Sequence, residues 1–206
     1  MAVLETIFIL SLALIVFIYA FYGPIMMFVR AIKGRREENL QASYPLPGIS
    51  LIIPAYNEEG WIRRKIENSL SLNYPKDKLE IIVVTDGSND KTNKIASEYQ
   101  ESIMLLHQSG RNGKIKAMDR AARIANHEVL VFTDANTDLN SNSLIYIGHQ
   151  YSDPLVGMVA GEKKVMAQDE GESAEAEGLY WKYESWLKQL DSDVSSVIGA
   201  AGELFS

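Results

Sequence analysis

The sequence contains no cysteine and only three histidines, and its globular part has no basic stripe. Without cysteine there is no disulfide framework and no thiolate metal site, which fits a reducing compartment. The histidines, His107, His127 and His149, are too far apart in the chain to show the spacing of zinc ligands. The formal net charge of −7 argues against a general nucleic-acid-binding protein, so we expect no nucleic-acid partner.

One segment, residues 7–29, lacks charged side chains altogether. As a helix its 23 residues extend roughly 34 Å, enough to cross a bilayer core of about 30 Å. Basic residues crowd positions 30–36, whereas Glu5 is the only charged side chain before the segment. We therefore expect residues 1–30 to form a single anchor in the plasma membrane, with the rest of the chain in the cytoplasm. The alternative is a cleaved signal peptide, but no basic start or small-residue cleavage site stands out.

Residues 31–48 are polar and then contain prolines, which predicts a short linker. From residue 49 the pattern alternates between short apolar runs and amphipathic stretches. Strands are expected at 49–53, 79–85, 103–107, 129–133 and 156–160, and helices at 58–71, 91–100, 114–126, 141–150 and 177–190. This alternation predicts an α/β fold with a mostly parallel sheet flanked by helices. The last helix is rich in aromatic residues. This pattern favours packing against the rest of the protein; the alternatives are a place at the bilayer interface and stacking on a sugar.

Residues 129–138 read V-L-V-F-T-D-A-N-T-D, a buried strand that ends in Asp134. In open α/β sheets, ligands bind at the carboxyl ends of the strands. Asn136 points the same way as Asp134 if the chain stays extended, because side chains alternate with a period of two. Two such oxygen donors can hold a hard divalent cation, which usually brings phosphates with it. The alternative is an ordinary turn after a strand.

Three further segments bring polar residues to helix starts or strand ends. After the first strand, Asn57 is a plausible helix N-cap with glutamates in the first turn, while residues 54–56 fit a turn that meets a flat base. After the second strand, Asp86 is placed to accept a hydrogen bond from a base or ribose, and Asp90 to cap the next helix. Residues 111–114 open a helix with cations and free backbone N–H groups, which suits a phosphate.

In this order the motifs IIPAYNEE, IIVVTDGSND, RNGKIKAMDRA, FTDANTD and EGLYWKYE followed by GAAGELFS resemble glycosyltransferase family 2. The likeness covers residues 49–206 and is greatest to the membrane-anchored polysaccharide synthases that make cellulose, hyaluronan or poly-N-acetylglucosamine. It implies a GT-A fold over residues 49–206. It also implies transfer of a sugar from a nucleotide sugar, most simply a UDP-sugar, to a glycan or lipid-linked acceptor.

The resemblance also implies site residues. The nucleotide-sugar pocket would include Ala55, Tyr56, Glu58, Asp86, Lys114 and Asp134. The family's metal-binding D-x-D would be formed by Asp134 and Asn136, which hold Mg²⁺ or Mn²⁺. Asn136 departs from the family pattern, because it is neutral where the family has a second aspartate.

In such an enzyme, an inverting transferase, the cation neutralises the leaving diphosphate while an acceptor hydroxyl attacks the anomeric carbon. The family's catalytic base is an aspartate in a later motif, and processive members add a Gln-x-x-Arg-Trp motif; the chain contains neither. Glu203 lies too early to be that base. We therefore expect the base beyond Ser206 and the chain to be an N-terminal piece of the enzyme.

The sequence bears on three other functions. A Rossmann dehydrogenase is excluded because no G-x-G-x-x-G follows the first strand. A sugar-1-phosphate nucleotidyltransferase would carry a Gly-rich, Arg-containing loop there, where this chain has Pro-Ala-Tyr-Asn. A catalytically silent membrane scaffold or regulatory subunit that retains the fold stays open, because of Asn136 and the missing base.

Overall fold

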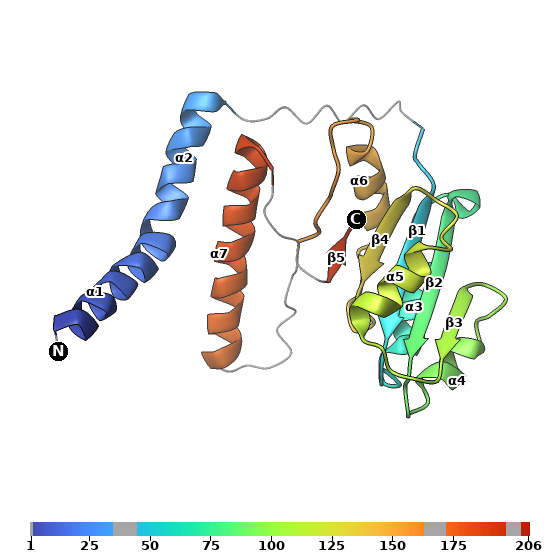
Figure 1. Cartoon of the computed structure of the whole chain (residues 1–206). Helices are drawn as coiled ribbons and strands as arrows, with labels where there is room; N and C mark the ends of the chain where they lie inside the picture. Colours follow the sequence, from blue (N-terminus) through green and yellow to red (C-terminus); the bar gives the residue numbers. More distant parts are fainter. Residues whose placement is uncertain (1, 35–44, 163–171, 197–202) are drawn as a thin grey trace. The chain divides into compact units, whose positions relative to one another are not determined.

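The computed structural model describes residues 2–34, 45–162, 172–196 and 203–206. These fall into two compact units, which we describe separately (Figure 1). One unit comprises residues 38–162 and 200–206, and the other comprises residues 1–37 and 163–199.

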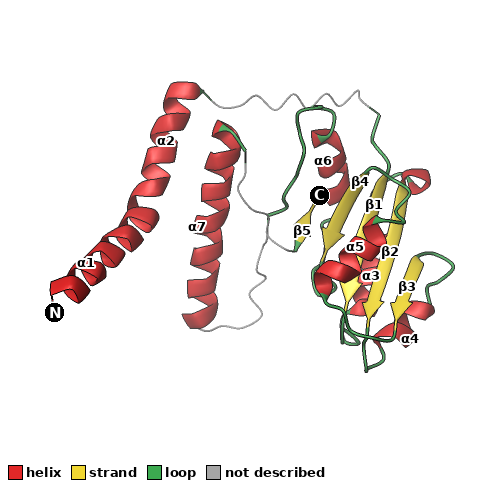
Figure 2. Ribbon diagram, viewed as in Figure 1, coloured by secondary structure: helices red, strands yellow, loops and turns green. Residues whose placement is uncertain are grey.

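The first unit is built on a five-stranded sheet in the order β3-β2-β1-β4-β5 (Figure 2). The strands are β1 (Ile49–Ala55), β2 (Leu79–Asp86), β3 (Met104–Gln108), β4 (Val129–Thr133) and β5 (Leu204–Phe205). The first four run parallel, and β5 pairs antiparallel with β4. The expected mostly parallel sheet is confirmed, and the carboxyl ends of β1, β2 and β4 therefore meet at one edge.

Helices cover both faces of this sheet. They are α3 (Ile62–Leu70), α4 (Thr92–Ser97), α5 (Lys114–Ala122) and α6 (Ser143–Gln150), with a short 3₁₀ turn η2 (Lys76–Lys78). Alternate side chains of β1 point to opposite faces of the sheet. Leu51 and Ile53 belong to a core cluster with residues of α3, α4 and α6, and Ile52 belongs to a cluster with residues of α5. Each of these β1 side chains is fully buried, which stabilises the fold by about 1.5–3 kcal/mol apiece.

Several of the expected elements differ from those observed. The helices expected at 91–100 and 114–126 end earlier, at Ser97 and Ala122. The helix expected at 58–71 begins only at Ile62, because the residues before it form a loop tied to a neighbouring loop. The strand expected at 156–160 is reduced to a single bridge between Ala160 and Phe205. Its antiparallel partner β5 is only two residues long, so few ladder hydrogen bonds can form there.

The second unit holds the apolar N-terminal segment and a long helix. The elements are α1 (Ala2–Val16), the π-helical turn η1 (Phe17–Phe21), α2 (Tyr22–Lys33) and α7 (Glu172–Val194). Pro24 has no N–H and its ring crowds the carbonyl four residues earlier, which accounts for the wider turn and the bend between α1 and α2 (Figure 1). α7 contains the aromatic helix expected at 177–190 and is longer at both ends.

α2 and α7 are in direct contact within this unit. A Cβ at Gly23 would clash with the indole ring of Trp186, so glycine permits the close approach of the two helices. The Tyr22 hydroxyl donates to Asp191 Oδ1 at 2.9 Å, and Arg30 pairs with Asp193 at 3.2 Å. Of the expected linker at 31–48, residues 35–44 lie outside the described residues.

Candidate functional site

A pocket opens at the edge of the sheet where β1, β2 and β4 end. It contains all seven residues that the resemblance singled out, namely Ala55, Tyr56, Glu58, Asp86, Lys114, Asp134 and Asn136. Five more residues complete the lining: Pro54, Arg111, Gly113, Ala117 and Ala135. The segments come from four places in the sequence, and the parallel sheet brings them together.

The loop after β1 has a different structure from the one expected. Asn57 is not a helix N-cap; it adopts a left-handed backbone conformation with φ of 54°. Its backbone N–H donates to Ser88 Oγ at 3.1 Å, and its side-chain oxygen accepts from the Asn89 N–H at 3.0 Å. Asparagine tolerates this conformation better than most residues, so Asn57 connects the loops after β1 and β2.

Further hydrogen bonds join the same two loops. Thr92 Oγ1 accepts from the Glu58 N–H, and Asp90 Oδ2 accepts from the Glu59 N–H. In return, the Glu59 carboxylate accepts from the Lys91 N–H at 3.0 Å. Asp90 Oδ1 also accepts from the backbone N–H of Thr92, the first residue of α4, although the N-cap position itself belongs to Lys91 and not to Asp90 as expected. The Glu58 side chain is left facing the pocket.

Asp86 is a buried carboxylate on the pocket wall, with 4% of its surface exposed. Its Oδ2 accepts from the backbone N–H groups of Asn112 and Gly113, at 2.9 and 2.7 Å. These two N–H groups are therefore not free to bind a phosphate, contrary to the sequence-based expectation. Asp86 Oδ1 is buried without a hydrogen-bond partner within the described part of the chain. An unsatisfied buried acceptor of this kind costs about 1–3 kcal/mol, so it marks a position for a donor group from a ligand.

Gly87 follows Asp86 and lies against the backbone of Arg111, which lines the pocket. Gly87 has φ of 69°, and a Cβ there would lie 2.5 Å from the Arg111 backbone nitrogen. The close approach of the two loops therefore requires glycine. The Arg111 guanidinium lies 4.0 Å from the centre of the Tyr56 ring, a cation–π contact. The sequence indicated residues 111–114 only as a segment suited to a phosphate; the contact of Arg111 with Tyr56 was not predictable, because it joins residues far apart in the sequence.

Asp134 and Lys114 form an ion pair, with 2.5 Å between Oδ1 and Nζ. Burial, followed by the nearby charges of Asp134 and Asp90, raises the pKa of the Glu58 carboxyl above its ordinary value. Lys114 thus offsets part of the negative charge that gathers at this end of the pocket.

The segment after β4 is a turn, so the extended chain that would point Asp134 and Asn136 the same way is not what forms there. The strand ends at Thr133, and the Thr137 N–H donates to the Asp134 carbonyl at 3.3 Å. A β-turn closed in this way still brings both Asp134 and Asn136 to the pocket. Asp138 does not line the pocket; it pairs with Arg64 on α3.

Asp134 and Asn136 present only oxygen donors, the type that Mg²⁺ and Mn²⁺ prefer. No cluster of three or more His, Asp or Glu side chains suited to a metal occurs among the described residues. A cation at this turn would therefore take most of its coordination shell from a ligand and water. The donor set fits a cation that binds together with phosphates.

The chain is similar in sequence to known proteins. The model of the family described as Glycosyl transferase family 2 matches residues 50–146. The beta-monoglucosyldiacylglycerol synthase of Trichormus variabilis is 27% identical over 205 residues, 97% of this chain and 41% of that protein. The poly-beta-1,6-N-acetyl-D-glucosamine synthase of Staphylococcus epidermidis is 28% identical over 121 residues, 57% of this chain and 29% of that protein.

Among solved structures, a mannosyltransferase from Pyrobaculum calidifontis in complex with GDP-Man and Mn²⁺ superposes with a TM-score of 0.71. It is 26% identical, and the alignment covers 89% of this chain and 51% of that one. The likeness confirms the GT-A fold. The chain spans less than half the length of the two curated relatives.

Proposed function

Because the chain belongs to glycosyltransferase family 2, we propose that its pocket binds a nucleotide-diphosphate sugar, most simply a UDP-sugar. The observation that carries this proposal is the buried, unpartnered oxygen of Asp86 in a pocket that also contains the oxygen donors of Asp134 and Asn136. The Asp86 oxygen can accept a hydrogen bond from the ligand, and the oxygens of Asp134 and Asn136 suit a cation that binds with phosphates.

Six of the pocket residues then have a role in binding the nucleotide sugar. Asp86 Oδ1 accepts a hydrogen bond from the base or ribose, and Ala55 and Tyr56 line the nucleotide pocket. Asp134 and Asn136 would hold Mg²⁺ or Mn²⁺, which would neutralise the charge of the leaving diphosphate. Lys114 is half exposed, so its ammonium group would be available to the phosphates once Asp134 binds the cation.

We propose that the sugar passes with inversion to a hydroxyl group of a glycan or lipid-linked acceptor. The hydroxyl oxygen forms a bond to the anomeric carbon while the bond to the diphosphate breaks, and a base takes the hydroxyl proton. We assign that base to no residue of this chain. The two curated relatives are named for a polysaccharide and a glycolipid product, which supports this range of acceptors.

We further propose that the chain is anchored in the plasma membrane by its N-terminal helix, with the pocket on the cytoplasmic side. The apolar helix Val3–Lys33 has 31 residues, about 46 Å, which exceeds the bilayer core of about 30 Å. Part of the helix can therefore lie outside the bilayer core, and we assign α2 to that part. Its Arg30 is paired with Asp193, and its Tyr22 hydroxyl donates a hydrogen bond to Asp191. Charged and hydrogen-bonded groups of this kind fit the headgroup region better than hydrocarbon.

The experiment that tests nucleotide binding is calorimetry of UDP, and of GDP in parallel, on the full chain in detergent with Mn²⁺ or Mg²⁺. We expect UDP to bind with either metal and binding to be lost in Asp134→Ala and Asp86→Ala. Asp119→Ala is a matched control, since Asp119 forms an exposed pair with Arg123 and does not line the pocket.

A second candidate is a membrane-anchored scaffold that keeps the fold without catalysis. The neutral Asn136 favours it, since the turn offers a single carboxylate to a cation. Absence of heat with either nucleotide and either metal would support the scaffold over the transferase. Release of the chain from membranes by carbonate without detergent would contradict the anchor and leave the nucleotide proposal standing.

A further inference from the structure

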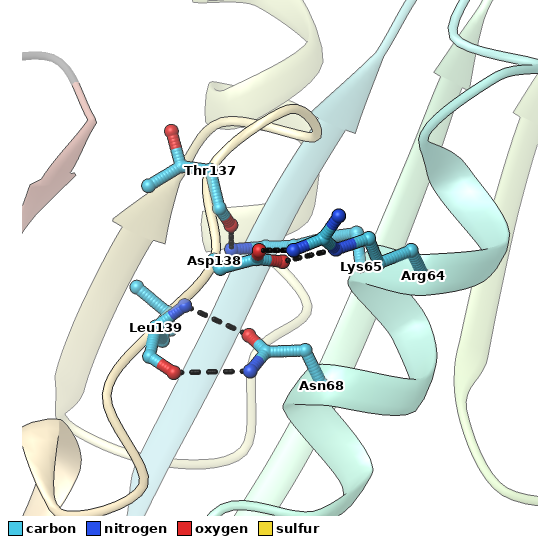
Figure 3. Close-up of polar contacts among 6 residues, drawn as sticks. All are labelled: Arg64, Lys65, Asn68, Thr137, Asp138 and Leu139. Carbon is cyan, nitrogen blue, oxygen red and sulfur yellow. Dashed lines mark hydrogen bonds and ion pairs between the residues drawn. The ribbon is translucent and has the colours of Figure 1, made fainter. Parts of the chain in front are cut away.

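Helix α3 contacts the segment that follows β4 through side chains at three positions (Figure 3). Arg64 forms two contacts with the Asp138 carboxylate. Asn68 bonds both backbone groups of Leu139, donating to its carbonyl at 3.0 Å and accepting from its N–H at 2.8 Å. Lys65 lies between them, and it bonds nearest to the turn that holds Asp134 and Asn136.

The Lys65 ammonium connects the two ends of that turn. Its Nζ donates to Thr133 Oγ1 at 2.9 Å and to the Thr137 carbonyl at 2.5 Å. Thr133 is the residue before Asp134, and Thr137 is the residue after Asn136. Lys65 therefore bridges the residues on either side of the two oxygen donors without touching either donor.

A lysine in this position is not required by packing alone. Lys65 is 1% exposed, and the helix around it buries Ile62 and Ile66. An apolar side chain of similar length would fill the same space without the several kcal/mol that burying an ammonium group costs. Burial lowers the pKa of Lys65 to about 7, against the opposing effect of the Asp138 and Asp134 charges. Because burying the Lys65 ammonium group costs free energy, we expect this group to have a function beyond packing.

Two lysines thus act near Asp134 from different sides. Lys114 pairs with its carboxylate on the pocket side and is half exposed, so a cation or a phosphate can displace it. Lys65 is enclosed by protein and bonds the backbone and hydroxyl groups next to the donors. Its contacts do not compete with a bound cation.

We propose that Lys65 is a positioning residue that holds the turn from Thr133 to Thr137 in the shape that aims Asp134 and Asn136 at the cation. The role in cation binding rests on the proposed function, whereas the hold on the turn does not. Groups that orient metal ligands from behind typically change metal affinity by about 10- to 100-fold when they are removed.

The test compares Lys65→Met with Asn68→Ala in the full chain in detergent. Methionine keeps the length of the side chain and loses both hydrogen bonds. The control removes two hydrogen bonds from the same helix to the same segment, but at Leu139, beyond the turn. Lys65→Gln, which retains an N–H donor, is measured alongside in case the methionine variant does not fold, with a smaller effect expected in the same direction.

The first readout is amide hydrogen exchange over residues 134–139 without any ligand. We expect Lys65→Met to speed exchange at residues 135–137 by about 10-fold or more, and Asn68→Ala to speed it only around Leu139. Unchanged exchange at 135–137 in Lys65→Met and Lys65→Gln would overturn the proposal.

The second readout is the affinity for UDP by calorimetry, with Mn²⁺ and with a chelator. We expect the Mn²⁺-dependent affinity to fall about 10-fold or more in Lys65→Met and to stay within about twofold in Asn68→Ala. Equal losses in both variants would reduce Lys65 to a stabilising residue and contradict a specific role. If the wild-type chain binds no nucleotide, the proposed function fails, and hydrogen exchange still decides whether Lys65 holds the turn.

Discussion

Lys114 Nζ and Asp134 Oδ1 lie 2.5 Å apart, in the pocket that Asn136 also lines. A cation that binds Asp134 must compete with this ammonium group for the same carboxylate. Under the proposed function, phosphates that arrive with the cation would give Lys114 a new partner. The ion pair would then couple metal binding to nucleotide binding.

Replacing Lys114 should move two affinities in opposite directions. Lys114→Ala removes the competitor, so affinity for Mn²⁺ alone should rise by up to about fivefold, the usual range for an exposed pair. Affinity for UDP with Mn²⁺ should fall by about 10- to 100-fold, because a charge-assisted hydrogen bond is lost. Titration calorimetry measures both.

Lys116→Ala is the matched control, since Lys116 lies on the same helix and does not line the pocket. Both affinities should stay near the wild-type values in this variant. A change of both affinities in the same direction in Lys114→Ala would contradict the coupling.

The buried carboxylate of Asp86 should be sensitive to the loss of one oxygen. In Asp86→Asn, an amide N–H₂ group replaces one of the two carboxylate oxygens. Depending on the orientation of the amide, this group faces either the backbone N–H groups of residues 112 and 113 or the ligand, and it cannot accept a hydrogen bond from either. We expect UDP affinity to fall about 10- to 100-fold, which corresponds to an unsatisfied buried group of about 1–3 kcal/mol. Calorimetry beside Asp119→Asn checks this, and unchanged UDP affinity would remove Asp86 from the site.

Part of the pocket could be predicted from the sequence. Apolar runs that stop at Asp86 and Asp134 predict strand ends, and parallel pairing then brings the two together. The contacts of Asn57 were not predictable in this way. A local rule makes Asn57 a helix cap, but Ser88 and Asn89 take its hydrogen bonds instead, and these residues are close only in the folded chain.

The burial of Lys65 is indicated by its position in the sequence but not by its residue type. It lies three residues after Ile62 and one before Ile66, which places it on the buried face of an amphipathic helix. As a charged residue beside two arginines, it suggests a solvated face. Only the structure shows that Thr133 and Thr137 provide its partners.

The burial of Lys65 predicts a pH dependence of stability. Its pKa falls from an ordinary value of 10.5 to about 7, so between these values the folded chain binds fewer protons than the unfolded chain. The free energy of unfolding should therefore rise with pH across this window, by at most about 1.4 kcal/mol per pH unit from this group. Below about pH 7 both states bind the proton, and the contribution stops changing.

Thermal or denaturant unfolding at pH 7 and pH 9 in wild type and Lys65→Met isolates this contribution, because other groups titrate in both proteins. The wild type should gain more stability than the variant over that interval. Identical changes in the two proteins would show that the Lys65 ammonium is not destabilised by burial.

The absence of cysteine makes the membrane proposal accessible to single-cysteine labelling without background. Leu12 and Ile32 are both exposed in the structure, and they lie on either side of the bend at η1. A membrane-impermeant maleimide should label Ile32→Cys in inside-out vesicles and not in intact cells. Leu12→Cys should react in neither unless detergent is added, and equal labelling of both positions would contradict a membrane span.

The claim that Asp134 holds a cation together with a nucleotide diphosphate is tested most directly by electron paramagnetic resonance of Mn²⁺. Free Mn²⁺ is titrated with the full chain in detergent, with and without UDP, in wild type and in Asp134→Ala. We expect UDP to increase Mn²⁺ capture by the wild type above the capture by UDP alone, and Asp134→Ala to abolish this increase. Equal capture by the two proteins in the presence of UDP would contradict the claim.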